Sequence, residues 1–362
     1  MSASTDAEIQ DNVRRPLGEN AHSVCNREPN MSETHLQIPL DAFRATAARI
    51  APYVSRTPLV PWRSTVLDAR LHPGTEVALK MELFQPTGTF KVRGAISNIL
   101  MLDADQRARG ITTISGGNHA IAAAYAARCF GLSAKVIMMP QANPARIAAA
   151  RAQGAEVIVA EGVEQGFGLL ERFKQEEGRS YIPSFPNEQV VAGTGTISLE
   201  IHEQWDAVDA IIVPVGGGGL ISGLAAASKL LSPGTLIYGV EPETAGVVGR
   251  SVEAGALQTM DRADTIADSL ASPITNACAV SFVSRYVDEV VRISDDAIAT
   301  ALALLFAEAK LAVEPAGAAA TAALLGPLRD RLAGKRVVVM ACGANIDAAG
   351  YSDVLARGAA LW

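Results

Sequence analysis

The sequence predicts an α/β protein whose parallel sheets are covered by helices on both faces. Short runs of β-branched and aliphatic residues alternate with longer, alanine-rich segments of helical character. Strands that are apolar along their whole length are typical of parallel sheets, because both faces of such a sheet are buried. The alternation of strands with helices favours the same arrangement. We expect eight strands, over residues 77–81, 111–114, 134–139, 156–160, 210–215, 236–240, 287–293 and 336–341.

The composition excludes several classes of protein. The chain has 362 residues, with 31 basic and 38 acidic side chains and a net charge of −7. It therefore offers no basic patch for nucleic acid or an anionic membrane. The cysteines are far apart, so neither a zinc site nor a disulfide framework is indicated. The longest apolar stretch, 297–307, is too short to span a bilayer and reads as a core helix.

The N-terminal segment, residues 1–37, is polar and aperiodic and is expected to be a disordered tail. It has no apolar core of a leader peptide. We therefore expect a cytoplasmic protein that acts on a small molecule.

The first chemically informative element is the helix start that follows the strand over 77–81. The run Pro-Thr-Gly-Thr-Phe-Lys-Val-Arg-Gly-Ala places Lys91 in the first turn. The positive end of the helix dipole and partial burial push an ammonium toward its neutral, nucleophilic form. Such an amine attacks carbonyl groups and forms Schiff bases. A lone lysine here is more often a solvated residue, so other segments must decide.

The strand over 111–114 runs into a polar turn, Ser-Gly-Gly-Asn-His, which opens a helix over 119–129. Backbone N–H groups at such a helix start form an anion site that suits a carboxylate. Ser115 and Asn118 lie on this site. Either side chain alone could instead cap the helix.

The strand over 210–215 is followed by four consecutive glycines, Gly216 to Gly219, and then by an apolar helix. Glycines leave the backbone open to close approach, and the helix start adds its dipole, so the loop predicts a phosphate site. A glycine turn without a ligand is the simpler alternative.

The following strand offers a competing interpretation. Gly216 and Gly218 follow a strand, and Glu241 ends the next one, roughly where a dinucleotide-binding fold places the acid that binds ribose. The last glycine of that motif is missing, since Ile221 or Ser222 stands in its position. An NAD-dependent oxidoreductase is therefore the weaker alternative.

Together these segments resemble the pyridoxal-phosphate (PLP) enzymes of the tryptophan synthase beta-like fold, in particular the serine/threonine dehydratase and serine racemase family. The matches keep their order from about Ile38 to the C-terminus. Besides the segments above, they are Ala192-Gly-Thr-Gly-Thr-Ile-Ser-Leu-Glu-Ile201, Gly239-Val-Glu-Pro-Glu243, Thr265-Ile-Ala-Asp268, Val313-Glu-Pro-Ala-Gly-Ala-Ala319 and Cys342-Gly-Ala-Asn345.

The resemblance implies a fold-type II enzyme with two doubly wound open-sheet domains and PLP in the cleft between them. It places a small substrate-side domain at residues 94–190, inserted into a large PLP-binding domain of residues 38–93 and 191–362.

The resemblance also implies the roles of the site residues. Lys91 would hold PLP as a Schiff base, Phe90 would lie by the ring and Asn118 would bond the ring hydroxyl. The candidate catalytic residues are Lys91 and Ser115. The implied cofactor-binding set is Phe90, Lys91, Asn118, Gly216, Gly217, Gly218, Gly219, Glu314 and Cys342. The implied binding site for the substrate carboxylate is Ser115, Gly116, Gly117, Asn118 and His119.

Cys342 is implied to lie beside the pyridine nitrogen. A thiol cannot protonate that nitrogen as an aspartate would, so the ring should stay neutral and be a weaker electron sink. A weaker sink favours elimination over transamination, with the cofactor carrying the carbanion chemistry. Cys342 could also be simply a small buried residue at the end of its strand.

The implied reaction is α,β-elimination from a 3-hydroxy amino acid, such as L-threonine, L-serine, 3-hydroxyaspartate or a bulkier relative. Lys91 would remove the α proton, and the cofactor phosphate would assist loss of the β hydroxyl. The products would be a 2-oxo acid and ammonia. A PLP-dependent racemase or a β-replacement enzyme remains an alternative, and a non-catalytic PLP-binding protein is a more remote one.

Two departures from the family pattern bear on the type of reaction and on metal binding. Gly116 stands where the racemases carry a second serine that acts as acid and base, so we expect a dehydratase. Val247 stands where cation-binding members carry an aspartate, beside Glu241 and Ala245, and valine cannot ligate a hard cation. We therefore expect no metal, with a site completed by water or by Glu243 as the alternative, and we expect a homodimer.

Overall fold

The apolar runs form two sheets in the computed structural model, which describes residues 37–361. The larger sheet has the order β1-β2-β10-β7-β8-β9, with only β1 antiparallel to its neighbour. Its strands are β1 Leu59–Pro61, β2 Glu76–Lys80, β7 Ala210–Pro214, β8 Leu236–Pro242, β9 Glu289–Ile293 and β10 Arg336–Met340. The smaller sheet has the order β5-β4-β3-β6 and is parallel throughout. Its strands are β3 Ile111–Ile114, β4 Ala134–Met138, β5 Glu156–Val159 and β6 Ser180–Tyr181.

All eight predicted strands are present, with ends that differ by at most two residues. The central strands are buried along their length, as β7 shows in every residue, which is why their sequences read as continuous apolar runs. Strands β1 and β6 were not predicted from the sequence. These strands have three and two residues, too few to show a periodic pattern.

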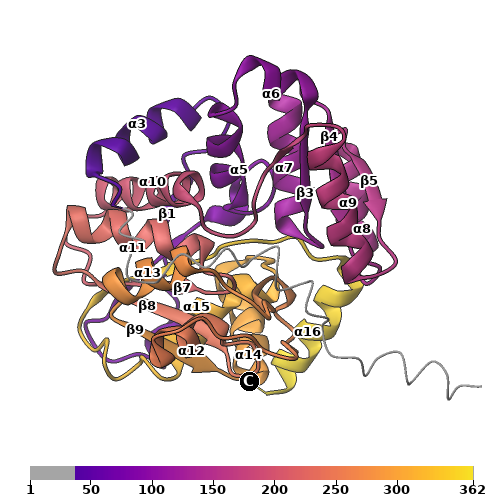
Figure 1. The fold of residues 1–362 in the computed structure, drawn as a ribbon. Coiled ribbons are helices and arrows are strands. Elements are labelled where there is room, and N and C mark those ends of the chain that lie inside the picture. The colour runs from indigo at the N-terminus through magenta and orange to yellow at the C-terminus, as the bar shows by residue number, and fades with distance from the viewer. Residues whose placement is uncertain (1–36, 362) are drawn as a thin grey trace, which may run out of the picture.

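Helices cover both sheets, as Figure 1 shows. Many begin at a side chain that accepts a backbone N–H of the first turn, for example Asn187, Asn276, Ser294 and Asp347. The helices are α3 Leu40–Ile50, α4 Thr65–Asp68, η1 Glu82–Phe84, α5 Lys91–Leu100, α6 Ala104–Arg109, α7 Asn118–Cys129, α8 Pro144–Ala152, α9 Val163–Gln175, α10 Glu188–Gln204, α11 Gly219–Leu231, α12 Val247–Ala254, η2 Asp268–Leu270, α13 Ala277–Tyr286, α14 Asp295–Leu304, η3 Leu305–Ala309, α15 Pro315–Leu325 and α16 Ala348–Ala360.

The stretch expected as one core helix over 297–307 is divided. The α-helix α14 ends at Leu304 and continues as a π-helical turn, η3, in which Phe306 is 46% exposed. None of the helices among residues 37–361 is both long and apolar enough to cross a membrane.

The two sheets define two lobes. We call residues 111–181, with β3 to β6 and α7 to α9, the small lobe, and the six-stranded sheet with the helices packed on it the large lobe. Figure 1 shows the small lobe, mainly magenta, beside the orange and yellow large lobe. We propose that the boundaries between the two domains lie near residues 94 and 190. The expected disordered tail lies, except for its last residue, outside the described residues.

Candidate active site

A cavity of about 890 Å³ is lined in part by residues that follow the carboxyl ends of β3, β4, β7 and β10. Ligands of open parallel sheets bind outside the carboxyl ends of the strands, because loops from several strands converge there. Every site residue named from the sequence lines this cavity. These are Phe90, Lys91, Ser115, Gly116, Gly117, Asn118, His119, Gly216, Gly217, Gly218, Gly219, Glu314 and Cys342.

Lys91 is the first residue of α5, as its sequence context predicted. Its Nζ donates to the backbone oxygen of Ser184 at 3.3 Å and lies 5.2 Å from the centre of the Phe90 ring. Burial lowers the pKa of Lys91 to about 8, although Cys342 and Glu314 act in the opposite direction. A substantial fraction of the amine is therefore neutral near physiological pH and can act as a nucleophile or base.

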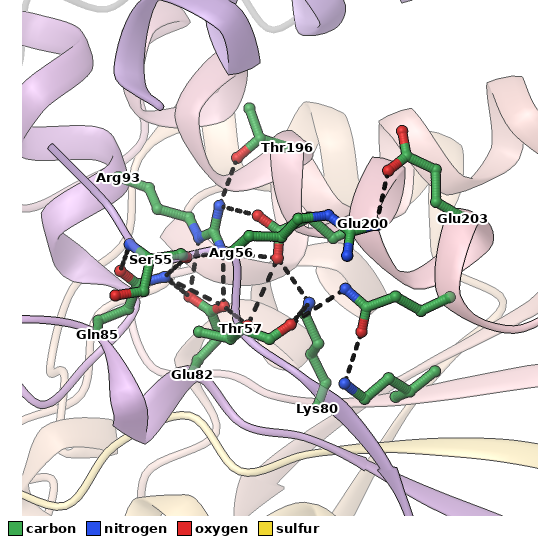
Figure 2. A network of polar contacts seen from close by, with 12 residues as sticks. Ser55, Arg56, Thr57, Lys80, Glu82, Gln85, Arg93, Thr196, Glu200 and Glu203 are labelled. Carbon is green, nitrogen blue, oxygen red and sulfur yellow. Dashed lines mark hydrogen bonds and ion pairs between the residues drawn. The ribbon is translucent and has the colours of Figure 1, made fainter. Parts of the chain in front are cut away.

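A buried network of charges holds the helix that carries Lys91 (Figure 2). Arg93, two residues after Lys91 on α5, pairs with Glu82 at 2.7 Å and with Glu200 of α10 at 2.7 Å. Lys80 of β2 also pairs with Glu200, at 2.6 Å. Two cations and two carboxylates thus compensate one another where β2, η1, α5 and α10 meet. This arrangement fixes the first turn of α5 relative to the large sheet.

The glycine loop joins β7 to the start of α11 and forms one wall of the cavity. Gly218 has a φ of +91°, in the region that favours glycine. A Cβ on Gly217 would lie 2.6 Å from a ring carbon of Phe185, so no larger residue fits there. Within residues 37–361, no hydrogen bond occupies the backbone N–H groups of Gly216, Gly217 and Gly218. The loop is therefore an open cradle that fits a phosphate.

The turn from Ser115 to His119 forms a second anion site in the same cavity. Helix α7 begins at Asn118, one residue earlier than expected, and neither Ser115 nor Asn118 caps it. His119 donates from Nε2 to the Ile182 oxygen at 3.0 Å, which fixes its tautomer. Burial lowers the pKa of His119 to about 3, so the ring is neutral. The turn offers backbone donors and the Ser115 hydroxyl without a competing charge.

The Asn118 side chain is held from both ends. Its Nδ2 donates to Glu314 at 2.7 Å and to Ser269 at 3.1 Å, and its Oδ1 accepts from Asn345 at 2.8 Å. Nearby, the Cys342 thiol donates to the Ala316 oxygen at 3.5 Å. Burial raises the pKa of that thiol far above its usual range, so it is neutral. A neutral thiol is the environment expected beside an unprotonated pyridine nitrogen.

Several cavity residues were given no role from the sequence, chief among them Arg146 and Ser269. Asp268 and Asn345 lie in motifs that carried the resemblance, but nothing in those motifs indicated what they contact. Arg146 lies in an alanine-rich helix, where it reads as a solvated side chain. Only the packing of α8 against the large lobe makes it part of the cavity.

Glu241 does not lie in the cavity. Its buried carboxylate accepts the N–H groups of Val248 and Gly249 at the start of α12. Glu241 therefore binds the N-terminal end of α12 and does not face a ligand on the glycine loop. The structure thus gives no support to the dinucleotide-binding alternative. Among the described residues there is no group of three or more His, Cys, Asp or Glu side chains that could hold a metal ion.

Two parallel-sheet lobes that present a phosphate cradle, a carboxylate site and a partly neutral lysine to one cavity define a class: PLP-dependent enzymes of fold type II. The chain belongs to the pyridoxal-phosphate dependent enzyme family, whose sequence model matches residues 50–343.

The relatives narrow the class further. The chain is 47% identical to phenylserine dehydratase of Ralstonia pickettii over 319 residues, which cover 88% of this chain and 97% of that protein. It is 36% identical to L-threonine ammonia-lyase of Thermotoga maritima, over 79% of this chain and 71% of that protein. The structure of maize serine racemase superposes with a TM-score of 0.83 at 33% identity, covering 90% of this chain and 99% of that one.

Proposed function

We propose that this chain is a PLP-dependent dehydratase that converts a neutral 3-hydroxy amino acid to a 2-oxo acid and ammonia. The observation that carries the proposal is the amine of Lys91, with its lowered pKa, in one cavity with two separate anion sites. One site fits the cofactor phosphate and the other fits the carboxylate of an amino acid.

The protein's part in this reaction is to bind, orient and move protons. PLP, when bound, supplies the electron sink for the carbanion chemistry. Lys91 would anchor the cofactor and remove the α proton of the substrate as the neutral amine. The turn from Ser115 to His119 would fix the substrate carboxylate. The neutral thiol of Cys342 would leave the pyridine unprotonated and so favour elimination.

A racemase is the second candidate, because maize serine racemase shares the fold at 33% identity. Gly116 argues against it. A glycine offers no hydroxyl to return a proton on the second face, although Ser115 beside it remains. Elimination needs only the base on one face, which Lys91 provides.

The charges of the cavity favour a substrate with a neutral side chain. Among the described residues that line it, only Lys91 and Arg146 are basic side chains other than His119. Arg146 is already paired with Asp268. The described residues of the cavity therefore leave no free cation for the second carboxylate of 3-hydroxyaspartate. Met139, Phe185, Leu270 and Pro273 also line the cavity and suit an apolar substituent such as the phenyl group of phenylserine.

The test has two stages. The purified protein should show a visible PLP band that borohydride removes, with the reduced adduct on Lys91. Phenylserine, threonine, serine and 3-hydroxyaspartate are then compared by oxo-acid release, and the neutral substrates should have the higher kcat/KM. A preference for 3-hydroxyaspartate would contradict the proposed substrate class. Enantiomer formed from L-serine faster than oxo acid would contradict the proposed reaction.

We further propose that the protein is a homodimer in the cytoplasm. The resemblance of the chain to the dehydratase family supports both statements. Light scattering of the purified holoenzyme measures the first, since a dimer would have twice the 37.8 kDa mass of the chain.

A further inference from the structure

Arg146 is a buried cation whose described hydrogen bonds all reach from the small lobe to the large lobe. It lies in the first turn of α8, and its side chain is 9% exposed. Its two terminal nitrogens bond the carboxylate of Asp268 at 2.5 and 3.0 Å, and its Nε donates to the Asn345 oxygen at 3.0 Å. A guanidinium held at three points has a fixed position and direction.

Glu314 faces this guanidinium from the start of α15. One of its oxygens, Oε2, lies 3.7 Å from Nη2 of Arg146 and has no hydrogen-bond partner among residues 37–361. The other oxygen, Oε1, accepts from Nδ2 of Asn118 at 2.7 Å. The residue is 1% exposed. A buried carboxylate with one unbonded oxygen is costly unless a positive charge faces it, and Arg146 provides that charge.

We propose that Arg146 is a positioning residue for the cofactor pocket: it favours the carboxylate form of Glu314, and Glu314 in turn holds the Asn118 amide in one orientation. The inference rests on the PLP-dependent function proposed above. A hydrogen bond to an ionised carboxylate is about twice as strong as one to a neutral acceptor. If Glu314 takes up a proton, its hold on Asn118 weakens, and the environment that Asn118 gives the cofactor changes.

The charges around Glu314 place this change near neutral pH. Burial raises the pKa of Glu314 to about 7; Arg146 lowers it, and Asp268 raises it. Lys91 and Cys342 also interact with Glu314, and the Cys342 thiol is neutral. An opposite charge at this range lowers a carboxyl pKa by about 1–3 units. Removing the Arg146 charge should therefore raise the pKa of Glu314 by a similar amount.

The experiment follows the absorbance of bound PLP against pH in the holoenzyme without substrate. The variants are Arg146→Met, Arg146→Lys, Glu314→Gln and the double variant Arg146→Met/Glu314→Gln. Arg151→Met is the matched control, because Arg151 is an exposed arginine in the last turn of the same helix. The wild type should show a spectral transition near pH 7.

The expected pattern distinguishes a positioning role of Arg146 from a general loss of stability. Arg146→Met should move the midpoint upward by about 1–3 pH units. Arg146→Lys keeps the positive charge, so its midpoint should lie close to that of the wild type. Arg151→Met should leave the midpoint unchanged. Glu314→Gln should remove the transition, and adding Arg146→Met to it should have no further effect on the spectrum.

Several outcomes would overturn the inference: an unshifted midpoint in Arg146→Met, an equal shift in Arg151→Met, or a transition that survives Glu314→Gln. If Arg146→Met does not fold, Arg146→Lys and Glu314→Gln decide, since the first must keep the transition and the second must lose it. A wild-type protein that binds no PLP would overturn the proposed function as well. A yellow protein with unchanged midpoints refutes the role of Arg146 alone.

Discussion

Burial shifts the pKa values of Lys91 and its neighbours in different directions. It lowers the pKa of Lys91 to about 8 and that of His119 to about 3, and it raises that of the Cys342 thiol. In each case burial favours the neutral form. The amine is consequently the group of the three that gains and loses a proton near neutral pH, which suits it to act as both anchor and base.

The lowered pKa of Lys91 predicts how cofactor attachment depends on pH. Only the neutral amine attacks the PLP aldehyde, and its fraction grows as the pH rises through about 8. The rate of reconstitution of the apoprotein should therefore rise steeply below pH 8 and level off above it. Stopped-flow absorbance measures this rate. A rate that keeps rising up to the ordinary lysine value of 10.5 would show that Lys91 is not desolvated.

Replacing Lys91 by alanine should abolish oxo-acid release and the borohydride-stable adduct together. The variant should still fold, because the aliphatic chain of Lys91 borders the cavity rather than the core. Turnover by Lys91→Ala at the wild-type rate would contradict both assigned roles.

At the level of elements, α5 connects the chemistry to the frame of the fold. Lys91 begins this helix, and Arg93 anchors it to Glu82 of η1 and Glu200 of α10 in the network of Figure 2. The network is neutral only as a whole. Removing one member leaves a buried charge without its partner, which costs more than the original pair contributes.

Arg93→Met should therefore lower the free energy of unfolding by about 3–5 kcal/mol. Arg56 is the matched control, because its pair with Glu203 lies on the surface, with side chains 57% and 64% exposed. Arg56→Met should change stability by less than about 1 kcal/mol. Urea denaturation of the two variants compares them directly. Equal effects would show that burial of the network does not determine its contribution.

At the level of the whole molecule, the cavity joins residues far apart in sequence. Asn143 and Arg146 of the small lobe contact Asp347, Asn345 and Asp268 of the large lobe, and the cavity lies among them. A ligand that binds groups from both lobes stabilises their association, because it binds the folded arrangement and not the unfolded chain.

Removing PLP should therefore lower the melting temperature, and restoring it at a hundred times its Kd should return about 2.7 kcal/mol of stability. Calorimetry of the apoprotein and the holoprotein measures this difference.

Removing divalent cations with EDTA should change neither stability nor activity, because the oxygens of Glu241 already accept backbone N–H groups and Val247 offers no ligand. Calorimetry measures the stability after chelation, and an assay with added magnesium measures the activity. Magnesium stimulation after chelation would refute the expectation of no metal.

The sequence determined the fold class, because its short, continuously apolar runs alternate with helical segments, which is typical of parallel sheets buried on both faces. It also named the lysine, the glycine loop and the Ser115 turn, since each of these acts through a local feature: a helix start, missing side chains or free backbone N–H groups. These signals lie within a few consecutive residues, and all thirteen residues named from them and from the family resemblance line the cavity.

What only the tertiary structure decided are contacts between elements distant along the chain. Arg146 and Glu314 are 168 positions apart, and no local pattern indicates that they face one another. The short strands β1 and β6 likewise exist through their neighbours rather than through their own sequence. The raised pKa of Glu314 and the lowered pKa of Lys91 depend on how completely the assembled lobes exclude water. Burial and charge pairing arise from contacts between elements that are distant along the chain, so they cannot be predicted from the residues next to each position.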